Sequence, residues 1–302
     1  MNDRLNQLAL FVRTVETGSF SKTAREFGLS QPSVSRAVAA LEGRLGVTLL
    51  RRTTRRISAT DVGLALAESA RIALEAIDEA EDTARGADQL TGVLRVTLPT
   101  AFGVRAIVPL LPGFLALQPG LRVDLMMSDR FDNLVAEGVD MALRLGNQPD
   151  SAFLTRKLTS AARIVVASPN YLQRRSVPKD IDELRHHDCL GGPGDAEHTD
   201  WTFIRAGKQE TVSKPVLVRT ASGSGLVACA VAGLGIAVAS EWMCAEELRD
   251  GRLTRILDEY GLEPITAFVV YGSGQHPSRK ARAFADYLIA AFTQKNLNGG
   301  AI

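Results

Sequence analysis

The apolar positions of the first 45 residues recur at the spacing of amphipathic helices. This pattern predicts a first helix over 5–16, ended by Gly18, and then two short helices joined by a tight turn. The turn falls at Gly28, because a helix end favours a residue in the left-handed region there. The apolar seam expected between the two short helices consists of Ala24, Phe27, Leu29, Val34, Val38 and Leu41.

Polar residues stand where these two short helices begin. Ser21 is expected to cap the first of them over 22–27, and Ser30 the second, in whose first turn Pro32 needs no N–H. The side chains left pointing outward from the second helix are those of Gln31, Ser33, Ser35 and Arg36. A helix-turn-helix presents its recognition helix to the major groove in this way, and Gln and Arg bond base edges there. An ordinary helical hairpin with a polar face is the alternative.

A short basic stretch after these helices is predicted to form a hairpin. Its strands, over 49–51 and 55–57, would pair about Thr53 and Thr54. Four arginines crowd the segment: Arg51, Arg52, Arg55 and Arg56. Like charges so close repel one another unless an anion lies nearby, and the phosphate backbone of DNA is such an anion. A merely solvated basic loop is the alternative.

A long helix is predicted over 62–90. Its apolar positions step by four and three residues, as in a coiled coil. They are Leu66, Ala70, Ala73, Ile77, Ala80, Ala84 and Ala87. Small residues let a partner helix approach closely, and two DNA-reading heads need a fixed spacing, so a dimer helix is expected. A helix lying on its own domain would show a similar stripe, and this alternative stays open.

Beyond residue 91, short apolar runs alternate with helical patterns, which implies parallel βαβ units with right-handed crossovers. The predicted strands cover 93–98, 122–127, 141–145, 154–158, 163–167, 215–219, 236–239 and 267–271. Helices are predicted over 103–118, 131–138, 169–174, 225–232, from Trp242 onward and over 278–294. Two small α/β lobes joined by crossing strands leave a cleft between them, where ligands of such sheets bind.

Charge separates the first sixty residues from the rest. Residues 1–60 hold 10 Lys and Arg against 4 Asp and Glu, whereas the remainder holds 25 against 30, for a net charge of +1. A basic module on an acidic body is the electrostatic footprint of a nucleic-acid binder. We find neither an apolar run of about 18 residues nor an export signal, so no membrane span is expected. Three cysteines without a CxxC pair fit a reducing cytosol.

Several segments resemble the LysR-type transcriptional regulators. In the head these are GSFSKTA over 18–24, SQPSVSR over 30–36, LE at 41–42, LG at 45–46, LLRR over 49–52 and Gly63. In the second lobe they are SPNY over 168–171 and AGLGIA over 232–237. The resemblance implies a winged helix-turn-helix, dimerisation through the long helix, tetramers built as dimers of dimers, and a two-lobed α/β effector domain like a periplasmic binding protein.

The resemblance also implies a division of the chain. The winged helix-turn-helix would span 1–61, the linker (dimerisation) helix 62–90 and the effector-binding domain 91–302. Within the effector domain, lobe I would comprise 91–163 and 268–302, and lobe II 164–267. Carried over by position, the DNA-binding residues would be Ser21, Gln31, Pro32, Ser33, Ser35, Arg36, Arg52, Thr54 and Arg56.

The inducer cleft is likewise implied by position. Its predicted residues are Thr100, Ala101, Phe102, Ser128, Gly146, Gly191, Gly192 and Ser222. A Ser or Thr beside a helix N-terminus offers donors to a carboxylate, so we expect a small organic anion as inducer. Many members have Asn-Asp near 221–222, where this chain has Ala-Ser. Inducer binding is expected to close the lobes and shift the angle between paired DNA heads.

Three rival signals were weighed. Gly223–Ala228 formally fits the dinucleotide fingerprint, which would make the protein a nucleotide-dependent oxidoreductase. Cys189 and Cys229 could form a redox pair, although buried spectator thiols are favoured. A possible metal cluster consists of His186, His187, Asp188, Cys189 and His198, but its spacing matches no standard zinc motif.

The sequence therefore predicts a transcription regulator that is not an enzyme and holds no metal or cofactor. Its expected partners are double-stranded promoter DNA, a small-molecule effector, further copies of the chain in a dimer or tetramer, and RNA polymerase. Its expected place is the bacterial cytoplasm, at the nucleoid.

Overall fold

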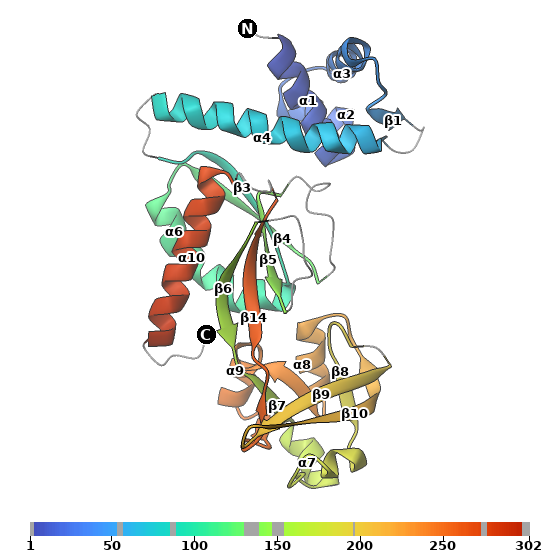
Figure 1. The fold of residues 1–302 in the computed structure, drawn as a ribbon, viewed down its shortest axis with the longest axis vertical. Coiled ribbons are helices and arrows are strands. Elements are labelled where there is room, and N and C mark those ends of the chain that lie inside the picture. Colours follow the sequence, from blue (N-terminus) through green and yellow to red (C-terminus); the bar gives the residue numbers. More distant parts are fainter. Residues whose placement is uncertain are drawn as a thin grey trace.

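In the computed structural model three bodies follow one another along the long axis: a head, lobe I and lobe II, with a long helix lying across between the head and lobe I (Figure 1). The structure describes residues 3–52, 57–84, 89–129, 139–146, 154–195, 197–272 and 277–297. The chain folds into a mixture of helices and strands, as the sequence predicts.

The head contains three helices and a two-stranded wing. The helices are α1 (Asp3–Thr17), α2 (Phe20–Glu26) and α3 (Gln31–Leu45). The wing pairs β1 (Leu50–Arg52) with β2 (Ile57–Ala59) as antiparallel strands, in the register Leu50 to Ala59. The inward face of α3 is a stripe at helical spacing, and its side chains Val34, Val38 and Leu41 are fully buried.

The prediction for the start of α2 was wrong. The helix begins at Phe20, and Ser19 is its N-cap, with its Oγ accepting a hydrogen bond from Lys22 N at 3.3 Å. Ser21 instead lies exposed on the first turn. Burial of the Phe20 ring, which is 6% exposed, explains why the helix starts earlier than the cap rule alone suggested.

The predicted seam of the head also needs correction at two positions. Phe27 and Leu29 are each 41% exposed, whereas Ala24 is buried as predicted. Gly28 has a φ of 64°, and Leu29 N donates to Ala24 O at 2.9 Å, so the chain reverses here. This reversal turns the Phe27 and Leu29 side chains out of the core.

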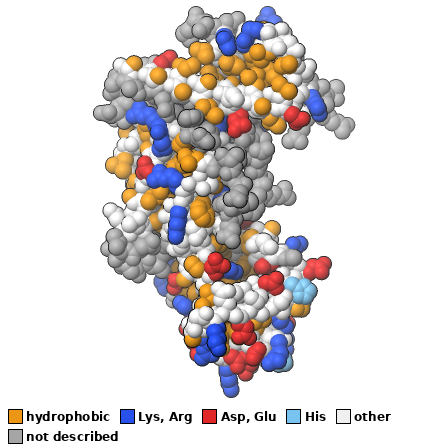
Figure 2. Space-filling model, viewed as in Figure 1, with side chains coloured by type: hydrophobic (Ala, Val, Ile, Leu, Met, Phe, Trp, Pro, Cys, Tyr) orange, Lys and Arg blue, Asp and Glu red, His pale blue; other side chains and the backbone are white. Residues whose placement is uncertain are grey.

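The long helix α4 (Asp61–Ala84) serves two surfaces. Its first half lies on the head, where Ala67 and Ala70 belong to the core. Ala73, Ala80 and Ala84 of the predicted stripe are exposed, and Ala87 lies outside the described residues. Figure 2 shows hydrophobic side chains gathered over the head and the adjoining part of α4. The first part of the stripe therefore lies on its own domain. The pairing of the exposed part with a second copy stays a prediction.

Lobe I is built on a five-stranded sheet in the order β4-β3-β5-β14-β6. Its strands are β3 (Gly92–Leu98), β4 (Leu121–Met127), β5 (Met141–Leu145), β6 (Thr155–Ala161) and β14 (Ile265–Tyr271). β3 runs parallel to β4 and β5, but β14 is antiparallel to both its neighbours, so the expected parallel pairing covers three strands only. The helix predicted over 131–138 lies outside the described residues.

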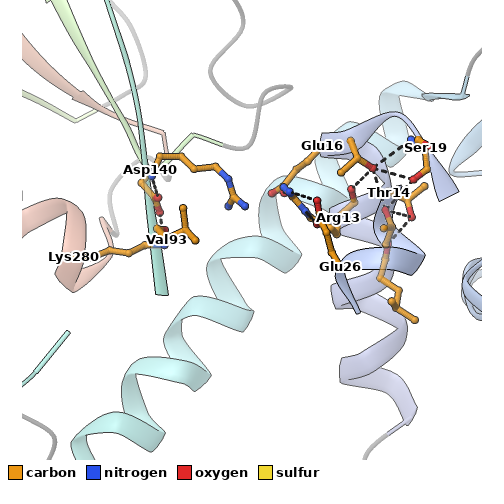
Figure 3. Close-up of polar contacts among 12 residues, drawn as sticks. Arg13, Thr14, Glu16, Ser19, Glu26, Val93, Asp140 and Lys280 are labelled. Carbon is orange, nitrogen blue, oxygen red and sulfur yellow. Dashed lines mark hydrogen bonds and ion pairs between the residues drawn. The ribbon is translucent and has the colours of Figure 1, made fainter. Parts of the chain in front are cut away.

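Asp140 ties the last helix, α10 (Arg279–Leu297), to this sheet. The buried carboxylate accepts from Lys280 Nζ at 2.9 Å and from the backbone N of Arg95 at 2.7 Å. Lys280 Nζ also donates to the carbonyl oxygen of Val93 at 2.8 Å (Figure 3). The pair thus fixes α10 against the edge where β3 and β5 begin.

The helix predicted over 103–118 starts three residues earlier, at Thr100, and the helical segment is broken into four pieces. They are α5 (Thr100–Phe102), a π-helical turn η1 (Gly103–Ile107), a 3-10 turn η2 (Val108–Leu110) and α6 (Leu111–Leu117). Pro109 and Pro112 lack the N–H that a continuous α-helix needs.

Residues 100–117 have the length and composition of a membrane span, contrary to the expectation that no such run occurs. The fold gives part of this apolar surface another use. Phe102, Ile107 and Phe114 are buried in the core. The ring of Phe114 lies 4.7 Å from that of Phe284 on α10.

Lobe II holds two sheets and three α-helices among the described residues. One sheet has the order β11-β7-β12 and the other β13-β9-β10-β8. The strands are β7 (Arg163–Ala167), β8 (Cys189–Gly191), β9 (His198–Arg205), β10 (Lys208–Arg219), β11 (Ala237–Ser240), β12 (Thr254–Ile256) and β13 (Gly261–Leu262). The helices are α7 (Pro169–Arg175), α8 (Gly223–Val231) and α9 (Glu241–Arg249), with a 3-10 turn η3 (Glu183–His186).

The β9–β10 hairpin is the largest element that the sequence did not predict in full. Only 215–219 of β10 was expected as a strand, and β9 was not expected at all. The chain passes between the lobes twice, from β6 into β7 and from β13 into β14. β14 joins the sheet of lobe I from Ile265 onward.

Candidate functional site

The outward start of α3 carries a group of polar side chains. Ser30 caps the helix, with its Oγ 3.3 Å from Ser33 N and 2.8 Å from Ser33 Oγ. Gln31 and Pro32 are exposed, and Ser33 is half-buried. Ser35 is half-buried one turn along, between the buried Val34 and the exposed Arg36. The structure thus places the predicted residues of α3 in its first two turns, with Pro32 and Arg36 facing away from the core and Ser33 and Ser35 on the two flanks of the helix.

Arg36 lies along this surface. Its Nε donates to Pro32 O at 3.4 Å and its Nη2 to Ser33 Oγ at 3.5 Å. Hydrogen bonds of that length are weak, so a base or a phosphate can replace them at little cost. The guanidinium group is therefore held near the helix surface and remains available to an anion.

Glu16 of α1 and Glu26 of α2 are already engaged in ion pairs. Glu26 pairs with Arg13 of α1, which also contacts Glu16 at 2.7 Å (Figure 3). This arginine holds the pKa of Glu26 below its ordinary value. The exposed cations of the head include Lys22, Arg25, Arg36, Arg44 and Arg51. The surface next to α3 is therefore positive, as DNA binding requires.

Glu42 joins α3 to the wing. Its Oε1 accepts hydrogen bonds from Leu49 N at 2.8 Å and Leu50 N at 3.0 Å. The side chain thereby fixes the point at which β1 begins relative to the recognition helix. Sequence analysis noted Glu42 only as part of a family signature and gave it no role.

Replacing Glu42 with alanine should weaken DNA binding, because two amides lose their acceptor and the wing loses its fixed position. Leaving buried polar groups unsatisfied costs about 1–3 kcal/mol each. We expect a lower melting temperature of the head together with a lower DNA affinity, measured by differential scanning calorimetry and fluorescence anisotropy. Glu42→Gln keeps an acceptor oxygen and should fall between the two proteins. Equal affinities for all three would contradict this role.

The predicted wing residues are described only in part. Arg52 belongs to β1, where its backbone pairs with Ile57, but its side chain is outside the described residues. Thr54 and Arg56 lie outside them altogether. The hairpin itself is present one or two residues further along than predicted.

A cavity of about 470 Å³ lies between the two lobes. Four of the predicted cleft residues line it: Ala101, Phe102, Gly146 and Gly192. The size is that of a small-molecule site. Both pairs of crossing strands contribute to its lining, through Arg163 on one side and Glu263 and Ile265 on the other.

The other four predicted residues lie beside the lining rather than in it. Thr100 N donates to Asp129 Oδ1 at 2.9 Å, and Ser128 N donates to Leu98 O at 3.0 Å. Ser222 caps α8, with its Oγ 3.5 Å from Gly225 N. Gly191 O accepts from Thr220 N within lobe II. In all four cases the next residue in the chain lines the cavity: Ala101, Asp129, Gly192 and Gly223. Asp129 and Gly223 were not among the predicted residues.

The charged residues of this cavity were not predicted from the sequence. Arg144, buried in β5, and Arg163, at the start of β7, both line it. Asp129, Asp195 and Glu263 supply the negative charges. The available signal was an arginine within or next to an otherwise apolar strand, as in MALRL over 141–145 and RIVVA over 163–167.

Gly223, the first glycine of the rival dinucleotide motif, has a packing role. A Cβ added there would lie 2.8 Å from Met243 Cε of α9, so a glycine lets α8 approach α9 within lobe II. His187 of the rival metal cluster is buried, and its Nδ1 lies 3.3 Å from Tyr171 Oη. Burial of Cys189 raises the pKa of its thiol to about 11, and Cys229 is half-buried. Both thiols are free.

Two family models match the chain. Residues 5–64 match the family model of the bacterial regulatory helix-turn-helix protein, lysR family. Residues 87–293 match the model of the LysR substrate binding domain. Among curated relatives, the HTH-type transcriptional regulator CrgA of Neisseria meningitidis is 32% identical, covering 96% of this chain and 97% of its own. An HTH-type regulator of Haemophilus influenzae is 33% identical over 91% of this chain and 96% of its own.

Solved structures give the same picture. CrgA of Neisseria meningitidis, titled a LysR-type transcriptional regulator, superposes with a TM-score of 0.60 at 30% identity, covering 95% of this chain and 98% of its own. Full-length AphB of Vibrio cholerae superposes with a TM-score of 0.59 at 26% identity, covering 96% of this chain and 99% of its own. ArgP of Mycobacterium tuberculosis gives 0.66 at 18% identity over 94% and 96%, a likeness of fold alone.

Proposed function

Since the chain belongs to the LysR family of transcription regulators, which bind DNA and small-molecule effectors, we propose that α3 reads its operator in the major groove. The observation that supports this most is the outward row of Gln31, Ser33, Ser35 and Arg36 on a helix whose other face is the head core. Ser21 and Pro32 lie at the starts of α2 and α3, where contacts to phosphate are expected. Arg52, Thr54 and Arg56 of the wing would lie beside them.

The experiment that tests this reading is a DNA titration of Arg36→Ala. We expect an affinity loss of about 1–3 kcal/mol for the operator and a smaller loss for unrelated duplex, measured by fluorescence anisotropy at physiological salt. The operator is first found by selection from a random duplex pool. Arg249→Ala, an exposed arginine of lobe II, is the matched control. Unchanged affinity of Arg36→Ala would count against the proposal.

We propose that the effector domain binds its ligand in the cavity between the lobes. The predicted residues Thr100, Ser128, Gly191 and Ser222 would support its walls from behind, and the four that line it would touch the ligand. The comparisons give no support to a nucleotide-dependent oxidoreductase. A small organic acid is the ligand class that we propose.

Members of this family form oligomers, and we propose that the exposed apolar row of α4 pairs with the same row of a second copy. The row includes Val62, which is 55% exposed, and Ala65, Ala73, Ala76 and Ala80. Most of its members are alanine, so two helices could approach closely. We propose a dimer of this kind, and tetramers as pairs of dimers.

Replacing Ala80 with glutamate should break the paired state, because a charge would be buried between the two helices. We expect a shift to smaller species in size-exclusion chromatography with light scattering. Ala290→Glu places the same charge on the exposed face of α10 and should leave the assembly unchanged. An assembly that is equally stable in both variants would rule out the α4 row as the interface.

Further parts of the proposal concern the assembly around the regulator. We propose the division 1–61, 62–90 and 91–302, with lobe I at 91–163 and 268–302 and lobe II at 164–267. A DNA-binding regulator of this family acts in the cytoplasm, and we propose that it associates there with the nucleoid. RNA polymerase is the proposed partner at the promoter.

A further inference from the structure

Two arginines line the cavity between the lobes, in different surroundings. Arg144 is buried in β5, whereas Arg163 is half-buried. Arg163 is separated by one residue from Ala161, the last residue of β6, so it stands at a crossing between the lobes. Within the part of the chain that the structure describes, the Arg163 guanidinium takes part in no hydrogen bond and no ion pair.

A partly buried guanidinium without hydrogen bonds destabilises the fold unless a ligand supplies acceptors for its N–H groups. Burial lowers the pKa of Arg163, and the charges of Asp195 and Glu263 offset this only in part. A guanidinium offers a planar set of N–H donors that matches a carboxylate in two parallel hydrogen bonds. The chemistry that complements this position is therefore an oxyanion.

The acidic residues of the cavity limit the charge that a ligand can bring. Asp195 Oδ2 accepts from Gly192 N at 2.7 Å and its Oδ1 from Thr199 Oγ1 at 3.3 Å. Asp129 Oδ1 accepts from Thr100 N at 2.9 Å. These carboxylates stay in place to support the cavity loops, and they would repel a second negative charge.

The remaining walls are largely apolar. Phe102 and Trp242 meet edge to face with their ring centroids 5.1 Å apart, and Leu226 and Met243 lie beside them in the lining. Phe102 comes from lobe I and the other three from lobe II. A ligand of about metabolite size would bury an apolar body here.

We propose that Arg163 anchors the carboxylate of an apolar monocarboxylic acid, whose body packs against Phe102 and Trp242. This inference rests on the proposed function, because it takes the cavity to be the effector site. It replaces the predicted ring of serine and threonine donors with one arginine as the anchor. A ligand held there touches both lobes and the crossing strand. Its binding can therefore change the position of one lobe relative to the other.

The test uses the full chain and simple probes. Wild type and Arg163→Met are titrated with 3-phenylpropanoate, 4-methylpentanoate and 2-naphthoate, and with 3-phenylpropanamide as the neutral counterpart, by calorimetry and thermal shift. Benzylmalonate serves as the doubly charged counterpart. Arg219→Met is the matched control, since Arg219 is exposed and donates to Asp195 O instead of lining the cavity.

We expect at least one monocarboxylate to raise the melting temperature of wild type, with little effect of the amide and of benzylmalonate. Arg163→Met should bind that acid at least about tenfold more weakly, as the loss of charge-assisted hydrogen bonds implies, while Arg219→Met binds normally. Without ligand, Arg163→Met should melt no lower than wild type, because it removes an unpartnered charge. A structural arginine would give the opposite result.

Three results would overturn the anchor: no carboxylate binds wild type, the amide binds as well as the acid, or Arg163→Met melts lower without ligand. DNA binding is measured in parallel on the same proteins. If the acid binds through Arg163 but wild type shows no affinity for any duplex, the proposed function fails and the anchor stands. If DNA binding is normal and the acid does not bind, the anchor alone fails.

Discussion

Replacing Gly63 with alanine should abolish operator binding and lower the melting temperature of the head. An added Cβ would overlap the carbonyl oxygen of Leu49 and lie 3.2 Å from Thr60 Oγ1. Leu49 cannot move away easily, because its side chain is fully buried and its N–H is bonded to Glu42. Overpacking of this kind costs about 1–3 kcal/mol, and here it displaces the strand that positions the wing.

The measurement compares calorimetric unfolding and DNA affinity of the full chain. The matched control is Gly43→Ala on α3, where a Cβ would meet nothing within 4 Å and the backbone is helical. Alanine there should raise stability by about 0.5–1 kcal/mol. If Gly63→Ala instead melts like wild type and binds DNA normally, the close approach of α4 to the wing is not needed.

The head could be predicted largely from local rules. Ser30, Pro32 and Gly46 mark the two ends of α3, and the stripe of Val34, Val38 and Leu41 fixes which face is outward. Gly46 has the left-handed conformation that ends such a helix. Local rules failed at α2, where two serines compete as N-cap. Burial of Phe20, a tertiary effect, decides between Ser19 and Ser21.

The position of the cavity could be predicted from the sequence, but its full set of lining residues could not. The predicted ends of the strands indicated where the loops come together, and four of the eight predicted residues line the cavity. At the ends of β4 and β10 the prediction misses the lining by one residue: Asp129 lines the cavity in place of Ser128, and Gly223 in place of the N-cap residue Ser222. Arg144 and Arg163 come from strands of two different sheets, β5 and β7, and no spacing rule in the sequence connects them.

The contact between the lobes bears on the predicted closure. Phe102 stacks on Phe292 of α10 and meets Trp242 of α9, and one core cluster includes residues of both lobes. Closing or opening by a rigid rotation must repack these rings. An ion pair between the lobes adds to this contact. Breaking it contributes to the free energy of lobe movement, and this contribution can be measured.

That pair joins Arg105 of η1 to Glu247 of α9. Both nitrogens of the guanidinium fork donate to the carboxylate, at 2.8 Å each, and the Glu247 side chain is only 6% exposed. The hydrogen bonds from Arg105 hold the pKa of Glu247 below its ordinary value. Because the folded-state pKa is lowered, the pair stabilises the fold above the ordinary pKa of Glu, and this contribution is lost as pH falls through the folded value.

Arg105→Met should therefore destabilise the effector domain by about 3 kcal/mol at neutral pH, since among the described residues the buried carboxylate then keeps one cationic partner, Arg252, at 3.4 Å. The difference from wild type should shrink in acid, where Glu247 takes up a proton. Chemical unfolding of the full chain at a series of pH values measures both. The double variant Arg105→Met with Glu247→Met removes the stranded charge and should recover much of the loss. A double variant as unstable as the single one would show that packing, and not the uncompensated charge, carries this contact between the lobes.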